Sequence, residues 1–193
     1  MKNKHHLALM RGVNVGGKNI IKMAELRACF EDLGFSDVAT YIQSGNVLFG
    51  VSGKTPKDLA SSIEKEVSKR FKCESSTVVL SHDELENVVK HAPKGFGKSP
   101  AKYRYDVIFL KEPLTAGKAI ESVRTREGVD EAHAGKGVLY FSRLISRATQ
   151  SYLRRIAETP IYQQMTVRNW NTTTKLLALM EERGGAGPQE LAL

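Results

Sequence analysis

A hydrophobic pattern that occurs twice constrains the fold of this chain more than any other feature. Each time it predicts the order strand, helix, strand, strand, helix, strand, because short apolar runs alternate with stretches whose apolar residues recur every three or four positions. The strands expected in the first half are 7–10, 38–42, 47–49 and 77–80, with helices starting near Met23 and Thr55. The strands expected in the second half are 107–110, 129–134, 138–141 and 165–167, with helices over 114–123 and 150–159.

This order predicts an α+β fold of two tandem ferredoxin-like subdomains, each a βαββαβ α-β plait with an antiparallel sheet. We expect the first subdomain over 1–80 and the second over 105–185, which includes a C-terminal helix over 172–183. Between them, 81–104 should hold a capped helix and a basic linker rich in Gly and Pro. The tail, 186–193, should be frayed. The duplication is inferred from element order alone.

Several classes of protein are not expected. No apolar run approaches the roughly 20 residues that cross a bilayer, and the amino terminus lacks the apolar stretch of a signal peptide. The two cysteines, Cys29 and Cys73, do not support a disulfide framework. The five histidines show no spacing typical of metal ligands. We therefore expect a cytoplasmic protein with no metal site, no cofactor and no membrane association.

The charge of the chain is strongly basic, with a formal net charge of +8. Residues 1–24, 87–105 and 132–157 each contain five Lys or Arg and no acidic residue. Gathered on one face, such segments would suit phosphate, nucleic acid or an acidic protein. As separate solvated loops they would affect only solubility and non-specific binding. Both interpretations stay open.

A glycine-rich loop follows the first expected strand. Its Gly12, Gly17 and Lys18 match the spacing of a P-loop, but Asn19 stands where a hydroxyl would bind Mg²⁺, so an NTPase loop is not expected. The loop still resembles an anion site before a helix. The ligand-binding residues predicted here are Arg11, Asn14, Gly16, Gly17, Lys18 and Asn19. The alternative is a turn whose glycines supply positive φ angles.

A second polar cluster lies between the last strand and the last helix. It offers an aromatic stacking face, amide groups and two cations, which together suit a base, a ribose phosphate or a carboxylate. The ligand-binding residues predicted in this cluster are Arg168, Asn169, Trp170, Asn171 and Lys175. In the alternative interpretation, Trp170 anchors the last helix and Asn171 or Thr172 caps it.

A third segment, 142–155, alternates arginines with hydroxyl side chains, a composition typical of phosphate contacts or of a solvated helix start. RNA-recognition motifs share the βαββαβ order. Their signature is only partly matched here, since Tyr140 is present but Val138 and Ser142 stand where aromatic side chains are needed.

Two stretches carry a resemblance to a known family. They read ALMRGVNVGGKNIIKMAELRACFEDLGFSDVATYIQSGNVLF and TVRNWNTTTKLLALME, and they resemble an uncharacterised bacterial family known as domain of unknown function 1697. The resemblance spans essentially the whole chain. It implies two α-β plait subdomains and no particular reaction. Family members often carry a glycine-containing stretch with a Ser-basic pair before the penultimate helix. Here Ser146 and Arg147 keep the pair and the glycines are lacking, so no binding role of that loop's backbone is implied.

Three functional hypotheses follow. The preferred one is a binding module for an anionic ligand, either nucleic acid or a phosphorylated small molecule, that uses the glycine-rich loop and the Arg-Asn-Trp-Asn cluster. The second is an enzyme acting on a phosphorylated metabolite, with Lys18 and Arg168 as electrostatic stabilisers. The third is a structural or self-associating protein. The sequence leaves open whether the chain is an enzyme, whether it oligomerises, and whether residues 11–19 and 166–175 form one site.

Overall fold

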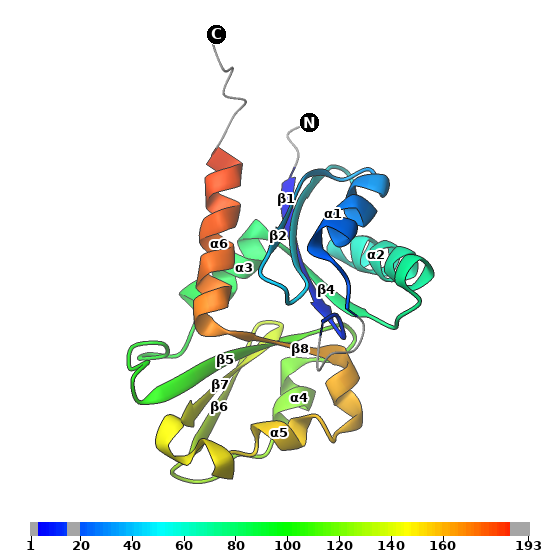
Figure 1. The fold of residues 1–193 in the computed structure, drawn as a ribbon. Coiled ribbons are helices and arrows are strands. Elements are labelled where there is room, and N and C mark those ends of the chain that lie inside the picture. Colours follow the sequence, from blue (N-terminus) through cyan, green and yellow to red (C-terminus); the bar gives the residue numbers. More distant parts are fainter. Residues whose placement is uncertain (1–3, 15–19, 186–193) are drawn as a thin grey trace. The chain divides into compact units, whose positions relative to one another are not determined.

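The computed structural model describes residues 4–14 and 20–185 (Figure 1). It confirms an α+β fold with two four-stranded antiparallel sheets and a C-terminal helix. The chain divides into two compact units, one of residues 1–85 with 175–193, the other of residues 86–174. Two helices, α3 (His82–Lys90) and α6 (Trp170–Gly185), run through the points where the chain passes from one unit to the other.

The first unit has the element order that the sequence predicts. Its elements are β1 (Lys4–Arg11), α1 (Met23–Asp32), β2 (Ser36–Tyr41), β3 (Asn46–Val51), α2 (Pro56–Phe71) and β4 (Ser76–Ser81). The strands lie in the order β2-β3-β1-β4, and α1 and α2 pack on one face (Figure 1). Cys29 and Cys73 are buried free thiols in this core, and burial raises the pKa of each.

The ends of two helices follow the capping chemistry of the sequence. Thr55 Oγ1 accepts a hydrogen bond from the backbone N–H of Asp58, and Pro56 occupies the first turn of α2. Ser81 and Glu84 form the expected capping box of α3, since Glu84 accepts from the Ser81 N–H and Ser81 Oγ accepts from the Glu84 N–H.

The second unit repeats the arrangement with more irregular connections. Its elements are β5 (Tyr103–Leu110), α4 (Ala116–Ser122), β6 (Asp130–Gly135), β7 (Val138–Leu144), η1 (Ile145–Gln150), α5 (Leu153–Ile156), η2 (Pro160–Gln164) and β8 (Met165–Asn169). The strands lie in the order β6-β7-β5-β8. The core between this sheet and the helices α4 and α5 contains Ile108, Phe141, Ile156 and Met165.

The single helix predicted over 150–159 is wrong. The segment contains one turn of α-helix, flanked by the 3₁₀ helices η1 and η2. The backbone N–H of Tyr152 donates to the side chain of Asp130, which lies at the start of β6. This N–H therefore takes no part in a continuous helix. Pro160 disfavours a helical conformation at Thr159 and so limits the segment at its other end.

Ile42, in the turn between β2 and β3, is a strained residue. It is 52% exposed and has φ +50°, a left-handed conformation that is costly for a β-branched side chain. Because Asn tolerates this region, Ile42→Asn is expected to raise the free energy of unfolding by about 1 kcal/mol in urea denaturation. Ile20→Asn is the control for replacing an exposed isoleucine, since Ile20 is 77% exposed, and it should change stability little. A destabilised Ile42→Asn variant would contradict the prediction.

Candidate functional site

The described ends of the glycine-rich loop are held together by Asn14. Its Nδ2 donates to the carbonyl of Ile21 at 3.0 Å, and its Oδ1 accepts from the Ile21 N–H at 2.7 Å. Asn14 has φ +55°, and Arg11 lies at the end of β1 opposite Ser76. Both hydrogen-bonding groups of the Asn14 amide are thus engaged in closing the loop. The predicted residues Gly16, Gly17, Lys18 and Asn19 lie outside the described part of the chain.

The Arg-Asn-Trp-Asn cluster lies where β8 meets α6. Asn169 Oδ1 accepts from the N–H of Asn171 at 2.9 Å, so Asn169 caps the helix, and the prediction that Asn171 or Thr172 does so is wrong. The guanidinium of Arg168 donates to the carbonyl of Val167, and burial lowers the pKa of Arg168 to about 10. Lys175 is exposed on α6.

Trp170 packs against Phe96, from the segment that precedes β5. Their ring centroids are 5.1 Å apart, and Phe96 also meets Tyr105 at 4.9 Å and Tyr140 at 5.4 Å, each edge to face. The Tyr140 hydroxyl donates to the carbonyl of Val88, and burial raises the pKa of Tyr140 to about 12. Side chains of the protein itself therefore cover these two tyrosines, which form no open platform for stacking RNA bases.

The predicted ligand residues are thus distributed over both units. Arg11, Asn14 and Lys175 belong to the first unit, and the segment from Arg168 to Asn171 belongs to the second. The contacts of Asn14, Asn169 and Trp170 within the described residues support the structure of a loop or a helix end. Their role in ligand binding stays a prediction.

The positive charge of the protein is concentrated in the second unit. Residues 86–174 contain 15 Lys or Arg against 8 Asp or Glu, a net +7 of the total +8. Five arginines of this unit are exposed in the loop before β6, on η1 and on α5, and we call this set the arginine surface: Arg124, Arg126, Arg147, Arg154 and Arg155. None of the five has a carboxylate within ion-pair distance among residues 4–14 and 20–185. These cations are therefore available to a ligand.

A buried carboxylate organises the arginine surface. Asp130, at the start of β6, is 6% exposed, and its Oδ2 accepts from the backbone N–H groups of Arg126 at 3.1 Å and Tyr152 at 2.8 Å. One side chain therefore joins the loop before β6 to the loop between η1 and α5. These two hydrogen bonds hold the segment that carries Arg124 and Arg126 beside the connection between η1 and α5, the elements that carry the other three arginines.

Tyr152 in turn holds two guanidinium groups. The Cζ of Arg155 lies 4.1 Å from the centre of the Tyr152 ring, and the Cζ of Arg126 lies 5.5 Å from it. Arg126 also donates to the carbonyl of Gln150. Stacking on an aromatic ring restricts a guanidinium without consuming its hydrogen-bond donors, so that, apart from the Nη1 bond of Arg126 to Gln150, the N–H groups can make the fork-like contacts that suit phosphate.

An ion pair lies on the helix-facing side of the same sheet. Arg143 Nη2 is 3.3 Å from Asp106 Oδ2, and both side chains are largely buried. Burial raises the pKa of the Asp106 carboxyl, while Arg143 and Arg104 act in the opposite direction. The register places Arg143 opposite both Arg104 and Asp130. The pair lies next to the carboxylate that organises the arginine surface.

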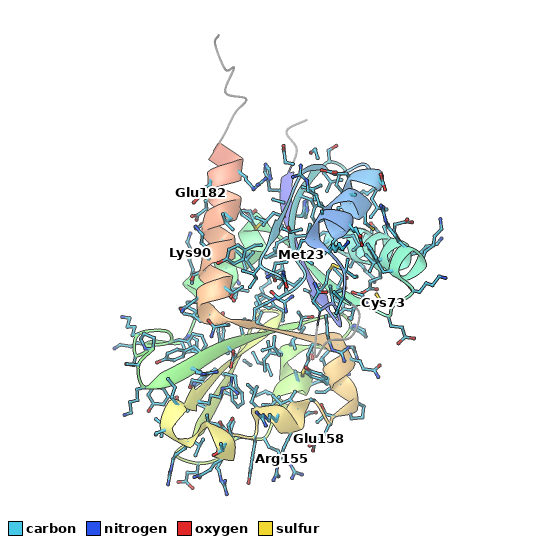
Figure 2. The ribbon with its side chains drawn as sticks, viewed as in Figure 1. Met23, Cys73, Lys90, Arg155, Glu158 and Glu182 are labelled. Carbon is cyan, nitrogen blue, oxygen red and sulfur yellow. The ribbon has the colours of Figure 1, made fainter. Side chains whose placement is uncertain are left out.

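A cavity of about 440 Å³ adjoins this surface. Its lining includes Arg124 and Arg155, and Figure 2 shows the side chain of Arg155 at α5 and that of Glu158 in the turn that follows. The described residues contain no group of three or more His, Cys, Asp or Glu side chains arranged to hold a metal ion. Nor does any helix among them have the length and apolar character to span a membrane.

Sequence reasoning missed Asp130, Tyr152, Arg124 and Arg126 as parts of one surface. The composition of segment 142–155 pointed to phosphate contacts, but Asp130 is an isolated acid near a weak strand. One of its partners, Arg126, is four positions away, but the other, Tyr152, is 22 positions away, so no local pattern marks its bridging role. The net charge of residues 86–174 is the one sequence signal for this surface, and it can be counted only once the boundaries of the unit are known.

Comparisons with known proteins agree with the resemblance seen in the sequence. A family model described as a protein of unknown function (DUF1697) matches residues 3–140. Among solved structures, the conserved bacterial protein SP0830 from Streptococcus pneumoniae is similar, with a TM-score of 0.80 and 25% sequence identity. The alignment covers 93% of this chain and 99% of that one. No curated protein matches the chain significantly.

Proposed function

Since the chain belongs to the DUF1697 family of proteins of unknown function, we propose a function from its own geometry: it binds a phosphate-bearing ligand on the arginine surface of its second unit. The proposal covers both nucleic acid and phosphorylated small molecules. The observation that carries it is the group of five exposed arginines, unpaired with carboxylates among the described residues and organised by the buried Asp130.

The physical argument is one of preorganisation. Five like charges repel one another, so gathering them costs free energy that other contacts of the fold must offset. The Asp130 bonds and the Tyr152 stacking provide such contacts. A phosphate group would relieve the repulsion and would accept paired hydrogen bonds from the guanidinium groups.

The architecture is part of the proposal. The order βαββαβ and the strand arrangements β2-β3-β1-β4 and β6-β7-β5-β8 support two tandem ferredoxin-like subdomains. In this interpretation the second subdomain is the binding unit and presents loops rather than its sheet face. A bacterial cytoplasm, rich in nucleotides and nucleic acids, is the setting that we propose.

A charge-matched pair of variants tests the assignment. Arg147→Ala/Arg154→Ala/Arg155→Ala should weaken binding of a fluorescein-labelled dT20 oligonucleotide or of pyrophosphate by roughly tenfold or more at 50 mM salt. The slope of log affinity against log salt for the oligonucleotide should fall by about two, because each lost phosphate contact removes roughly 0.7. Fluorescence anisotropy measures the first ligand and calorimetry the second.

The control is Lys57→Ala/Lys65→Ala/Lys69→Ala, which removes three exposed charges from α2 in the first unit. This variant should bind within about twofold of the unmodified protein. Equal weakening by the two triple variants would show that only the net charge matters. Absence of binding by the unmodified protein to both ligands would disprove the proposal.

A further inference from the structure

The cavity beside the arginine surface has two kinds of lining. It lies within the second unit, between the end of α4 and the turn after α5, and its volume of about 440 Å³ lies in the range of small-molecule sites. On one side it is lined by Arg124 and Arg155, which belong to the arginine surface. Its other charged lining residues are Glu121 and Glu158.

The neutral polar groups of the cavity offer acceptors. The hydroxyl of Ser122 donates to the carbonyl of Lys118, and the hydroxyl of Thr159 donates to the carbonyl of Ile156. With their protons so used, both oxygens can only accept from a ligand. Four of the lining residues, Glu121, Ser122, Glu158 and Thr159, therefore carry acceptor groups, and two, Arg124 and Arg155, carry donors. Buried Ile156 adds an apolar wall.

This combination restricts the chemistry of the occupant. A ligand must carry an anionic group for the arginines and several hydroxyl or amino donors for the acceptors. An inorganic phosphate supplies only the first, and a fully esterified sugar supplies neither. A ribonucleotide supplies both, because a carboxylate pairs well with the vicinal hydroxyls of ribose, and its base is a flat apolar body with amino groups.

Resting on the proposed function, we infer that the cavity binds a free ribonucleoside monophosphate. Its phosphate lies on Arg124 and Arg155, and its ribose hydroxyls donate to Glu121 and Glu158. The arginine surface thus supplies the attraction to phosphate, and the two carboxylates supply selection for ribose over deoxyribose.

The test compares three probes by calorimetry at low salt: the four ribonucleoside monophosphates, their 2′-deoxy counterparts, and pyrophosphate. At least one ribonucleotide should bind roughly tenfold tighter than its deoxy counterpart, since the missing hydroxyl leaves a carboxylate without its charge-assisted hydrogen bond. Glu121→Gln/Glu158→Gln should abolish that preference and weaken ribonucleotide binding. The same double variant should leave pyrophosphate binding unchanged or tighter, because two repelling charges are gone.

Weaker ribonucleotide binding together with unchanged or tighter pyrophosphate binding would distinguish recognition of ribose from a general effect of charge. Glu127→Gln/Glu131→Gln is the control, because it removes two exposed carboxylates of the same unit that do not line the cavity, and it should keep the ribose preference. Equal affinity of ribo and deoxy forms in all four pairs would overturn this inference, as would tighter binding of every probe by Glu121→Gln/Glu158→Gln. If the unmodified protein still binds pyrophosphate in either of these outcomes, the inference of a ribonucleotide site fails but the proposed function stands. If it binds none of the probes and no oligonucleotide, the proposed function fails as well.

Discussion

Gly97→Ala is expected to lower the free energy of unfolding by about 3 kcal/mol. Gly97 has φ +81°, and a Cβ at this position would lie 2.2 Å from Nε1 and 2.6 Å from Cδ1 of Trp170. The left-handed conformation costs an alanine about 1–2 kcal/mol, and displacing the indole from Phe96 adds the rest. Since Trp170 is the only tryptophan of the chain, its fluorescence should also change.

Gly95→Ala is the matched control for this substitution. Gly95 has φ +87°, but an added Cβ would meet nothing within 4 Å. It should therefore cost only the backbone strain, about 1–2 kcal/mol, and should leave the Trp170 emission unchanged. Equal losses for Gly95→Ala and Gly97→Ala in urea denaturation would contradict the tight packing of the 91–102 segment under Trp170.

Arg143→Met is expected to have the second large effect, a loss of about 2–3 kcal/mol of stability at pH 7. The substitution removes the cation 3.3 Å from Asp106 and leaves a largely buried carboxylate that keeps only the weaker electrostatic attraction of Arg104 on the same strand. Breaking a buried pair by removing one partner is costly because the other charge stays desolvated. Chemical denaturation at fixed pH measures the loss.

The pH dependence of this loss has a defined sign. Burial raises the folded-state pKa of Asp106 above 3.8, so its contribution to stability is greatest below pH 3.8 and declines as pH rises through the folded-state value. Arg143 opposes that rise in pKa. Without Arg143 the folded-state pKa of Asp106 is higher, so the decline in stability begins at the same pH but continues to a higher pH. The Arg143→Met loss should therefore be much smaller near pH 4 than at pH 7. In an Asp106→Asn background it should be small and independent of pH. A loss of equal size at both pH values would show that the ion pair is not its cause.

Much of the fold could be predicted because its signals are local. Thr55 with Pro56, and Ser81 with Glu84, mark helix starts through contacts three residues apart, and the apolar spacing of the strands reflects one buried sheet face. The helix predicted over 150–159 was wrong because its structure depends on a distant contact. Its apolar residues fit a helix, but the bond from Tyr152 to Asp130 spans 22 positions and no local pattern reveals it.

The candidate site was predicted less well for the same reason. Polar side chains such as Asn14 and Asn169 stood out in the sequence, and in the structure their amides close a loop and cap a helix. The arginines of segment 142–155 were recognised by composition. The role of Arg126 depends on the fold, which places it over Tyr152. Short polar motifs mark turns and caps as readily as ligands, whereas a charged surface built from several loops requires the tertiary structure.

Backbone chemical-shift mapping with pyrophosphate tests the central claim most directly. On titration of the ¹⁵N-labelled protein at 50 mM salt, the largest saturable shifts should occur at the amides of residues 124–128 and 145–155, which carry the arginine surface. These shifts should shrink as salt is raised, because phosphate binding by guanidinium groups is screened by ions. Shifts concentrated in residues 11–21, or no saturable shifts in the second unit, would contradict the assignment of phosphate binding to this surface.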